Sequence, residues 1–276
     1  MSLKFKKILL TVIISTIPFL YFISYMNTTT KALSTNGCIE IPFSTRTPTI
    51  DGKWTQQNEW SDAKEIILKR EEQNHTVYIF IKHNTTHLFV LIDFLTDFTQ
   101  SSYDKAGICL DTNENGGQLP EPDDYLFSLC GTVYGAPLPP EIYRGTGHGK
   151  NLEDAWIPHQ IYNCQGKIGF TGENDPYENE KHRIYEFQIN LKFFPETNHY
   201  GVYIFVCDYH TNYSLLEWPE NAGGKWEKPS NPDPKQIPPP PDNWGSIKDH
   251  FIGEKFDIAC FMLIAGALTL LISRFR

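Results

Sequence analysis

Apolar positions between residues 38 and 218 recur with the period of strands, not of helices. The clearest case is Thr76–Lys82 (TVYIFIK) followed by His87–Phe94 (HLFVLIDF), two β-branched and aromatic runs joined by a polar turn. This arrangement predicts a β-hairpin. In Arg183–Leu191, apolar residues alternate with Glu, Gln and Asn, as expected of a half-buried strand.

Further strand-like runs follow one another at short intervals. They lie at Ile39–Ile41, Gly107–Asp111, Tyr125–Cys130, Ile157–Asn163, Lys167–Thr171 and Tyr200–Tyr209. No helical pattern longer than about two turns interrupts them. Many short strands at this spacing predict an all-β fold, an antiparallel β-sandwich over residues 38–225.

Both ends of the chain differ from this region because each contains a long apolar run with few charges. Residues 1–32 carry three lysines before an apolar run, and we expect a signal peptide or an N-terminal signal anchor. Residues 256–272 have no charge after Asp257 and precede two arginines, which predicts a transmembrane helix. The basic flanks belong in the cytoplasm, so we expect a single-pass or two-pass cell-membrane protein with an extracytoplasmic main domain.

The stretch between the sandwich and the predicted membrane helix has a different composition. Residues 226–250 are rich in proline, with four in a row at 238–241. Such a segment favours an extended, semi-rigid chain. We therefore expect a linker that holds the domain away from the membrane.

The charge balance narrows the range of partners. The chain has 24 Lys and Arg against 33 Asp and Glu, which gives a net charge of −9. An acidic surface repels nucleic acid and suits cations or neutral ligands.

Cysteines and Asn-x-Ser/Thr triplets agree with an outward-facing domain. Of six cysteines, one lies in the predicted membrane helix, and the odd remainder leaves at least one thiol unpaired within the chain. Candidate disulfides are Cys109 with Cys130 and Cys164 with Cys207. Possible glycan acceptors are Asn27, Asn74, Asn84 and Asn212.

An acidic loop between two predicted strands is the main candidate for chemistry. Its polar residues are Asp111, Asn113 and Asn115, followed by Gly116 and Gly117 and then by Asp123 and Asp124. Alternating oxygen side chains before a glycine resemble the first half of a calcium loop, but Pro122 replaces the expected glutamate and strands flank the loop. We predict a calcium site made of the two asparagines and three aspartates. An ordinary Asn/Gly-rich connection is the alternative.

Several motifs, in order, resemble family 9 carbohydrate-binding modules and the wider group that includes DOMON and ethylbenzene-dehydrogenase-like haem domains. They are Pro48–Trp54 with Glu59-Trp60 and Ala63, Leu88–Val90 with Asp93 and Asp97, Gly107–Asp111 with Asp124–Phe127, Tyr185–Ile189, and Gly201–Asp208 with Trp218-Pro219. The resemblance covers roughly residues 45–220. It implies a jelly-roll-like sandwich, often with bound calcium, that holds its ligand on loops or on a concave face.

The resemblance also implies that two tryptophans clamp a sugar ring, and Trp156 and Trp218 are the candidates. Tyr143, Arg144 and His148 belong to the long loop expected over residues 135–154 and complete the predicted ligand set. The competing interpretation is that a tryptophan in a sandwich packs in the core, as we expect of Trp54 and Trp60.

We therefore predict a non-catalytic, membrane-anchored protein that binds a glycan or another cell-surface ligand. The sequence has no G-x-S-x-G or His-Glu-x-x-His motif, and a solvated face or a metal site explains Asp93 with Asp97 as well as a hydrolase pair does. One alternative is a haem-bearing electron carrier with paired histidine ligands, for which His148, His159, His182, His199 and His210 are available. Another is a structural cell-envelope protein that binds only neighbouring subunits.

Overall fold

The computed structural model describes residues 38–117, 119–131, 139–148, 152–209, 214–220, 222 and 244–248. The chain divides into two units, Met1–Thr35 and Asn36–Arg276, and every described residue belongs to the second. The predicted segments 1–32 and 256–272 lie outside the described residues. Within the described part of the chain, no helix has the length and apolar character needed to cross a membrane.

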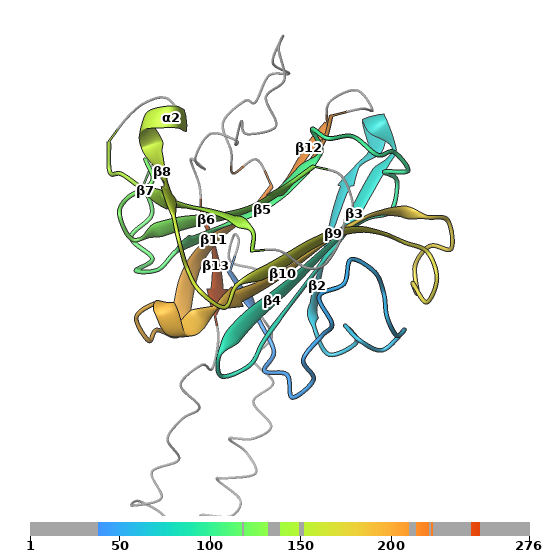
Figure 1. Ribbon diagram of the computed structural model, residues 1–276, viewed down its shortest axis with the longest axis horizontal. Helices are drawn as coiled ribbons and strands as arrows, with labels where there is room; N and C mark the ends of the chain where they lie inside the picture. The colour runs from blue at the N-terminus through green and yellow to red at the C-terminus, as the bar shows by residue number, and fades with distance from the viewer. Residues whose placement is uncertain are drawn as a thin grey trace, which may run out of the picture. The chain divides into compact units, whose positions relative to one another are not determined.

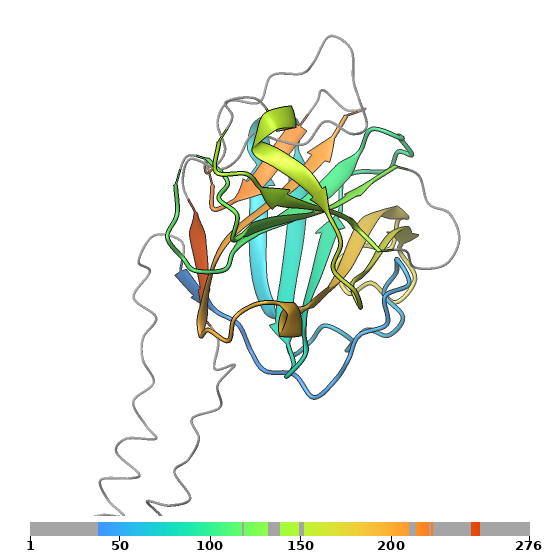
Figure 2. The ribbon, with the colours of Figure 1, turned by 60° about the vertical axis from the view of Figure 1, so that its left-hand side comes forward.

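Two sheets face each other and form an all-β sandwich (Figures 1 and 2). The first sheet has eight strands: β1 (Cys38–Glu40), β13 (Gly245–Lys248), β11 (His199–Asp208), β5 (Lys105–Asp111), β6 (Asp124–Cys130), β7 (Glu141–Gly145), β8 (Trp156–His159) and β12 (Ser214–Trp218), which pairs with β11. The second has five: β2 (Lys64–Arg70), β3 (His75–His83), β4 (His87–Phe94), β10 (His182–Asn190) and β9 (Gln165–Thr171). The helices are short: η1 (Glu71–Gln73), α2 (Leu152–Ala155) and η2 (Leu191–Phe193). Among these strands only β1 and β13 pair in parallel.

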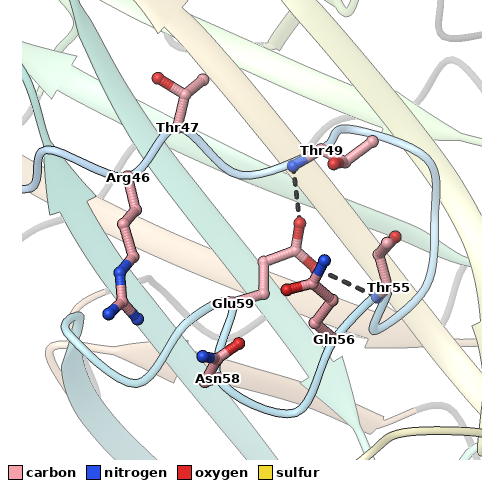
Figure 3. Close-up of a pocket in the computed structure, with 7 residues that line it drawn as sticks. All are labelled: Arg46, Thr47, Thr49, Thr55, Gln56, Asn58 and Glu59. Atoms are coloured by element: carbon pink, nitrogen blue, oxygen red, sulfur yellow. Dashed lines mark hydrogen bonds between the residues drawn. The ribbon is translucent and has the colours of Figure 1, made fainter.

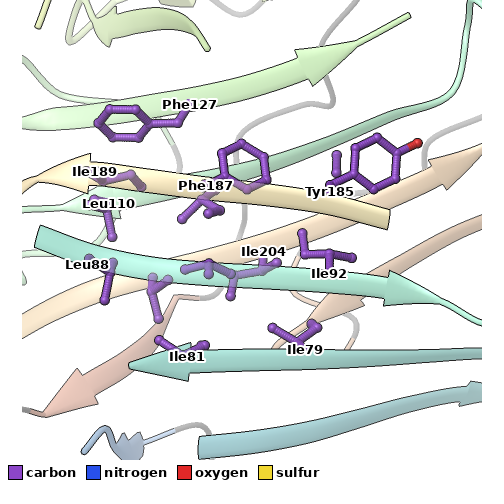
Figure 4. Close-up of a cluster of buried hydrophobic side chains, with 14 of the residues drawn as sticks. Ile79, Ile81, Leu88, Ile92, Leu110, Phe127, Tyr185, Phe187, Ile189 and Ile204 are labelled. Atoms are coloured by element: carbon purple, nitrogen blue, oxygen red, sulfur yellow. The ribbon is translucent and has the colours of Figure 1, made fainter. Parts of the chain in front are cut away.

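The main core lies between the sheets and is built from the inward-facing residues of both (Figure 4). Ile79 and Ile81 of β3 and Phe187 of β10 are at most 1% exposed, while the residues between them point outward. This is the period-two pattern read from the sequence, so the predicted hairpin and the alternation in β10 are confirmed. The expectation that β10 is half-buried is wrong, because Ile184 and Glu186 on its other face are also 0% exposed.

The segment before β2 covers the outer face of the second sheet. Trp54 and Trp60 pack there against Phe80, Phe89 and Leu91, so their predicted packing role is confirmed. The carboxylate of Glu186 accepts hydrogen bonds from the backbone N–H groups of Asp51 and Gly52 at 2.7 and 2.5 Å. One buried acid thus ties the start of the domain to the middle of the sheet.

The sequence did not predict four of the observed strands, and one predicted strand is shorter than expected. β2 and β12 were not expected, β7 lies in the predicted loop 135–154, and β8 ends at His159 instead of residue 163. β13 corrects the prediction that 226–250 is only a linker. Its Ile247 is 1% exposed and joins the main core, and the strand pairs with both β1 and β11.

The predicted disulfides are absent from the described residues, where all five cysteines are free. Cys109 pairs across the sheet with Leu126, four residues before Cys130 on β6. Four residues of strand span roughly 13 Å, which is too far for a disulfide. Cys164 contributes to the core between the sheets, and Cys207 pairs across the first sheet with Lys105.

Candidate metal centre

The acidic loop connects β5 to β6, and the strand register brings its ends together. Asp111 is the last residue of β5 and pairs directly with Asp124, the first residue of β6. Paired residues on adjacent strands project to the same face of a sheet. Both carboxylates are therefore held at the mouth of one hairpin, where each residue is only 1% exposed.

Three of the five predicted metal ligands lie close enough to share one ion. Carboxylate oxygens of Asp111, Asp123 and Asp124 lie within 4.8 Å of one another. The two asparagines instead serve the loop itself. Asn113 Oδ1 accepts a hydrogen bond from the backbone of Asn115 at 2.9 Å, and Asn115 Nδ2 donates to Glu121 at 3.0 Å.

Two oxygens of this cluster are buried without a hydrogen-bond partner, namely Asp123 Oδ2 and Asp124 Oδ1. Burial, together with the charges of Asp111, Asp123 and Glu121, raises the pKa of Asp124 to about 8, although a backbone hydrogen bond from Glu121 opposes the shift. Burial also raises the pKa of Asp123, with Asp111 and Glu121 adding to the effect. A bound cation would satisfy both oxygens and offset the repulsion, so these residues fit a hard divalent ion.

Two glycines allow the acidic loop to turn. Gly116 and Gly117 adopt φ angles of +64° and +130°, which favour glycine. The turn lets the backbone N–H of Gly116 donate to Asp111 Oδ2 at 2.8 Å. Trp244, just before β13, donates from Nε1 to the carbonyl of Gly117 at 3.3 Å and braces the loop from the side.

The other face of the loop rests on the end of β7. Arg144 Nε donates to the carbonyl of Pro122, and the N–H of Gly147 donates to Pro120 at 2.8 Å. A Cβ on Gly145 would lie 2.1 Å from the carbonyl oxygen of Glu121, so glycine permits the close approach. Arg144, predicted as a ligand residue, therefore lies at the rim of the acidic loop.

Arg144 is also part of a partly exposed surface, which we call the β8 ledge and define as Arg144, Ile157, His159 and Phe193. Arg144 pairs with Ile157 across the β7–β8 ladder. The ring of Phe193, the last residue of η2, lies 5.8 Å from that of His159. Ile157 and Phe193 are 49% and 44% exposed. β8 is the edge strand of its sheet, and Figure 1 shows it beside β7 at one end of the sandwich.

Tyr143 and His148 lie near the loop but not on the ledge. Tyr143 pairs with Leu126 and packs on the cluster outside the first sheet, and its hydroxyl donates to Glu141 at 2.9 Å. His148 is exposed, and its Nδ1 lies 3.0 Å from the carbonyl of Thr146. Only Arg144 of these three is in the ledge.

The two tryptophans expected to clamp a sugar are packing residues, and this expectation is corrected. Trp156 is 4% exposed and packs with Cys109, Leu126 and Tyr203 outside the first sheet. Trp218 is 9% exposed and belongs to the main core. Neither indole presents an open ring face for stacking on a sugar.

The histidines considered as haem ligands have separate surroundings. His182 is fully buried between the carboxylates of Asp93 and Asp175. His199 lies 3.7 Å from Glu114. His210 is outside the described residues.

The segment before β2 forms a pocket that the sequence did not predict (Figure 3). The pocket has a volume of about 340 Å³ and is lined by Arg46, Thr47, Thr49, Thr55, Gln56, Asn58 and Glu59. Glu59 is already engaged, since its carboxylate accepts from the backbone of Thr49 at 2.7 Å and of Thr55 at 3.1 Å. The lining contains no aromatic ring, so this pocket lacks a stacking surface for a sugar.

Neither a protein-family model nor a curated protein sequence matches this chain. Among solved structures, it is similar to a family 9 carbohydrate-binding module from Caldicellulosiruptor kristjanssonii in complex with cellotriose. The identity is 15%, the TM-score 0.45, and the match covers 77% of this chain and 93% of the other. A family 9 module from the same organism in complex with glucose gives 14% identity, a TM-score of 0.45 and coverages of 77% and 95%. These structures represent the family whose motifs the sequence resembles.

Proposed function

We propose that this domain is a non-catalytic carbohydrate-binding sandwich in which the acidic loop binds Ca²⁺ and the β8 ledge receives the sugar. The observation that carries the proposal is the exposed ring of Phe193 beside His159, on the ledge whose Arg144 contacts the acidic loop. Display outside the cell, anchored by residues 256–272, stays a prediction from the sequence.

The ledge offers the two kinds of contact that a sugar needs. The face of an aromatic ring packs against the apolar C–H side of a pyranose, and Phe193 is 44% exposed. Arg144 supplies guanidinium donors for hydroxyl oxygens. Burial and the nearby charge of Arg144 lower the pKa of His159, which favours the neutral imidazole next to Phe193.

Bound Ca²⁺ would stabilise the acidic loop next to this surface. Asp111, Asp123 and Asp124 would hold the ion through carboxylate oxygens, the ligand type that Ca²⁺ prefers. The ion supplies positive charge that offsets three neighbouring acids. Because Arg144 contacts the loop at Pro122, a fixed loop also fixes one side of the ledge.

Removing calcium is expected to lower the melting temperature of the protein. At a Ca²⁺ concentration 100 times Kd, binding contributes about 2.7 kcal/mol, or about 5–10 °C for a domain of this size. Asp124→Asn should abolish the calcium-dependent rise. Without calcium it should melt above the wild type, because folding disfavours ionisation of this carboxyl, whose pKa is raised to about 8, and the amide has no such cost. Differential scanning fluorimetry with Ca²⁺ and with EGTA measures both effects.

The exposed carboxylate of Asp154 provides the control for this experiment. Asp154→Asn should keep the full calcium response. If the wild type melts at the same temperature with Ca²⁺ and with EGTA, the loop is an ordinary strand connection and the calcium proposal is wrong.

Sugar binding is expected to depend on Phe193 and Arg144. A glycan array would identify a ligand, and isothermal titration calorimetry would compare its affinity for variants. We expect Phe193→Ala and Arg144→Ala each to weaken binding roughly 10-fold or more, equivalent to about 1.4 kcal/mol. Tyr162→Ala is the matched control, since Tyr162 is 72% exposed but lies outside the ledge. Equal losses in all three variants would show that the sugar does not lie on the ledge.

A further inference from the structure

A second ionisable cluster lies far from the acidic loop in sequence and is completely buried on the outer side of the second sheet. It consists of Asp93 on β4, Asp175 in the β9–β10 connection and His182 at the start of β10. All three side chains are 0% exposed. His182 Nε2 lies 2.7 Å from Asp93 Oδ1 and 3.0 Å from Asp175 Oδ2.

The hydrogen-bond partners of His182 restrict its protonation. Its Nδ1 lies 2.7 Å from the carbonyl oxygen of Glu180, which can only accept, so Nδ1 carries a hydrogen. The opposite nitrogen, Nε2, faces two carboxylate oxygens. It therefore carries a second hydrogen, as an imidazolium, accepts a hydrogen from a protonated aspartate, or donates its lone pair to a cation that the carboxylates share.

An imidazolium leaves one oxygen unsatisfied. The single Nε2 hydrogen is directed to Asp93 Oδ1, and Asp175 Oδ2 is buried without a hydrogen-bond partner. Its one close contact is the ion pair with Nε2 at 3.0 Å, whose hydrogen already serves Asp93, and a buried acceptor without a hydrogen of its own costs free energy. A metal ion at Nε2 would serve both carboxylates at once.

The far side of each of the three groups is already fixed by another hydrogen bond. Trp54 Nε1 donates to Asp93 Oδ2 at 3.1 Å, and the backbone of Tyr177 donates to Asp175 Oδ1 at 2.8 Å. Glu180 holds His182 from behind. Metal ligands are typically oriented by such outer contacts, above all a ligating histidine whose other nitrogen donates to a carbonyl.

We propose that Asp93, Asp175 and His182 form a buried site for a first-row divalent metal ion, and that the physiological ion is Zn²⁺. One imidazole and two carboxylates suit zinc, whereas calcium prefers oxygen ligands alone. Binding replaces the Nε2 proton: the imidazolium releases H⁺ to solvent, and neutral His182 and two carboxylates neutralise the ion.

The ion would link parts of the chain that are distant in sequence. Asp93 belongs to the centre of the second sheet, Asp175 to a connection, and Trp54 brings in the segment that precedes β2. The described cysteines form no disulfides that could do this. The proposed metal site would therefore stabilise the packing of these segments on the outer side of the second sheet.

The test uses the full chain, purified without a polyhistidine tag and stripped of metal, then titrated with ZnCl₂. We expect one tightly bound zinc by mass spectrometry, a raised melting temperature, and proton release seen as a dependence of the binding enthalpy on the buffer. Asp175→Asn should lose this binding. Trp54→Phe, which removes only the indole donor, should weaken it roughly 10-fold.

Glu173→Gln changes an exposed carboxylate of the same connection and should leave zinc binding unchanged. Asp124→Asn should also retain it, which separates this site from the calcium loop. Co²⁺ added to the wild type should give the d–d absorption of a nitrogen- and oxygen-ligated ion, a readout that needs no variant to fold. Absence of zinc binding and of a cobalt spectrum in the wild type would overturn the proposal and leave a buried ion triad. Retention of zinc by folded Asp175→Asn would overturn it equally.

Discussion

Replacing Arg183 with methionine is expected to lower the free energy of unfolding by about 3–5 kcal/mol, because it leaves buried carboxylates without their counterion. The guanidinium is 0% exposed and lies 2.7 Å from Asp104 and 3.7 Å from Asp97. It also donates to the carbonyls of Gly131 and Ser101, both at 3.2 Å. Urea denaturation of the wild type and the variant measures the loss.

The destabilisation caused by Arg183→Met should be smaller at lower pH. Burial and then the charges of Asp104 and Asp208 already raise the pKa of Asp97 to about 6 in the folded protein. Removing Arg183 raises this pKa further, so the folded variant binds more protons than the unfolded chain and gains stability as the pH falls from 7.5 to 5. Lys53→Met is the control, because Lys53 makes a 3.9 Å ion pair with Asp51 at 59% exposure and should change stability by less than about 0.5 kcal/mol. An equally small loss for Arg183→Met would contradict this account of the cluster.

Gly169→Ala is expected to destabilise the domain by about 3 kcal/mol or more, because backbone occupies the space that a methyl group would need. A Cβ at Gly169 would lie 1.7 Å from the carbonyl oxygen of Gly52, where the segment before β2 crosses β9. Gly52 itself adopts a φ of +80° and is held by Glu186. The crossing therefore has little freedom to adjust. Thermal and urea denaturation would measure the effect.

Gly166→Ala, on the same strand, separates this clash from a general effect of changing a glycine in β9. A Cβ there would meet the side chain of Leu129 at 2.6 Å, and a leucine side chain can change rotamer. We expect a markedly smaller loss for this variant. Similar losses at both positions would show that the Gly52–Gly169 crossing is not specially constrained.

The sequence predicted the strands that carry a long alternating pattern and missed those without one. In β2 (KEIILKR), charged residues occur on both faces and only Leu68 is buried, as an edge strand permits. β13 is four residues long and follows a proline-rich stretch, so its composition favoured a linker. Its pairing with β1 joins residues about 200 positions apart, which no local pattern reveals.

The candidate site shows the same division between local and distant information. Asp111, Asp123 and Asp124 belong to one hairpin, so their spacing sufficed to predict that they meet. The exposure of a tryptophan depends on distant strands, and Trp156 is covered by Cys109 and Tyr203. Phe193 escaped notice because its exposure follows from the end of β10 and the position of edge strand β8. Asp93, Asp175 and His182 come from three separate elements and share no sequence motif.

The most direct test of the central claim is to locate a bound sugar by protein-observed NMR, with an oligosaccharide ligand identified on the glycan array. In calcium-loaded protein, we predict the largest chemical-shift changes at the Phe193 ring, the Arg144 guanidinium and Ile157. We expect Asp124→Asn to reduce them. Changes centred on the pocket lined by Arg46 and Glu59, or none with any glycan, would contradict the proposal that the β8 ledge binds carbohydrate.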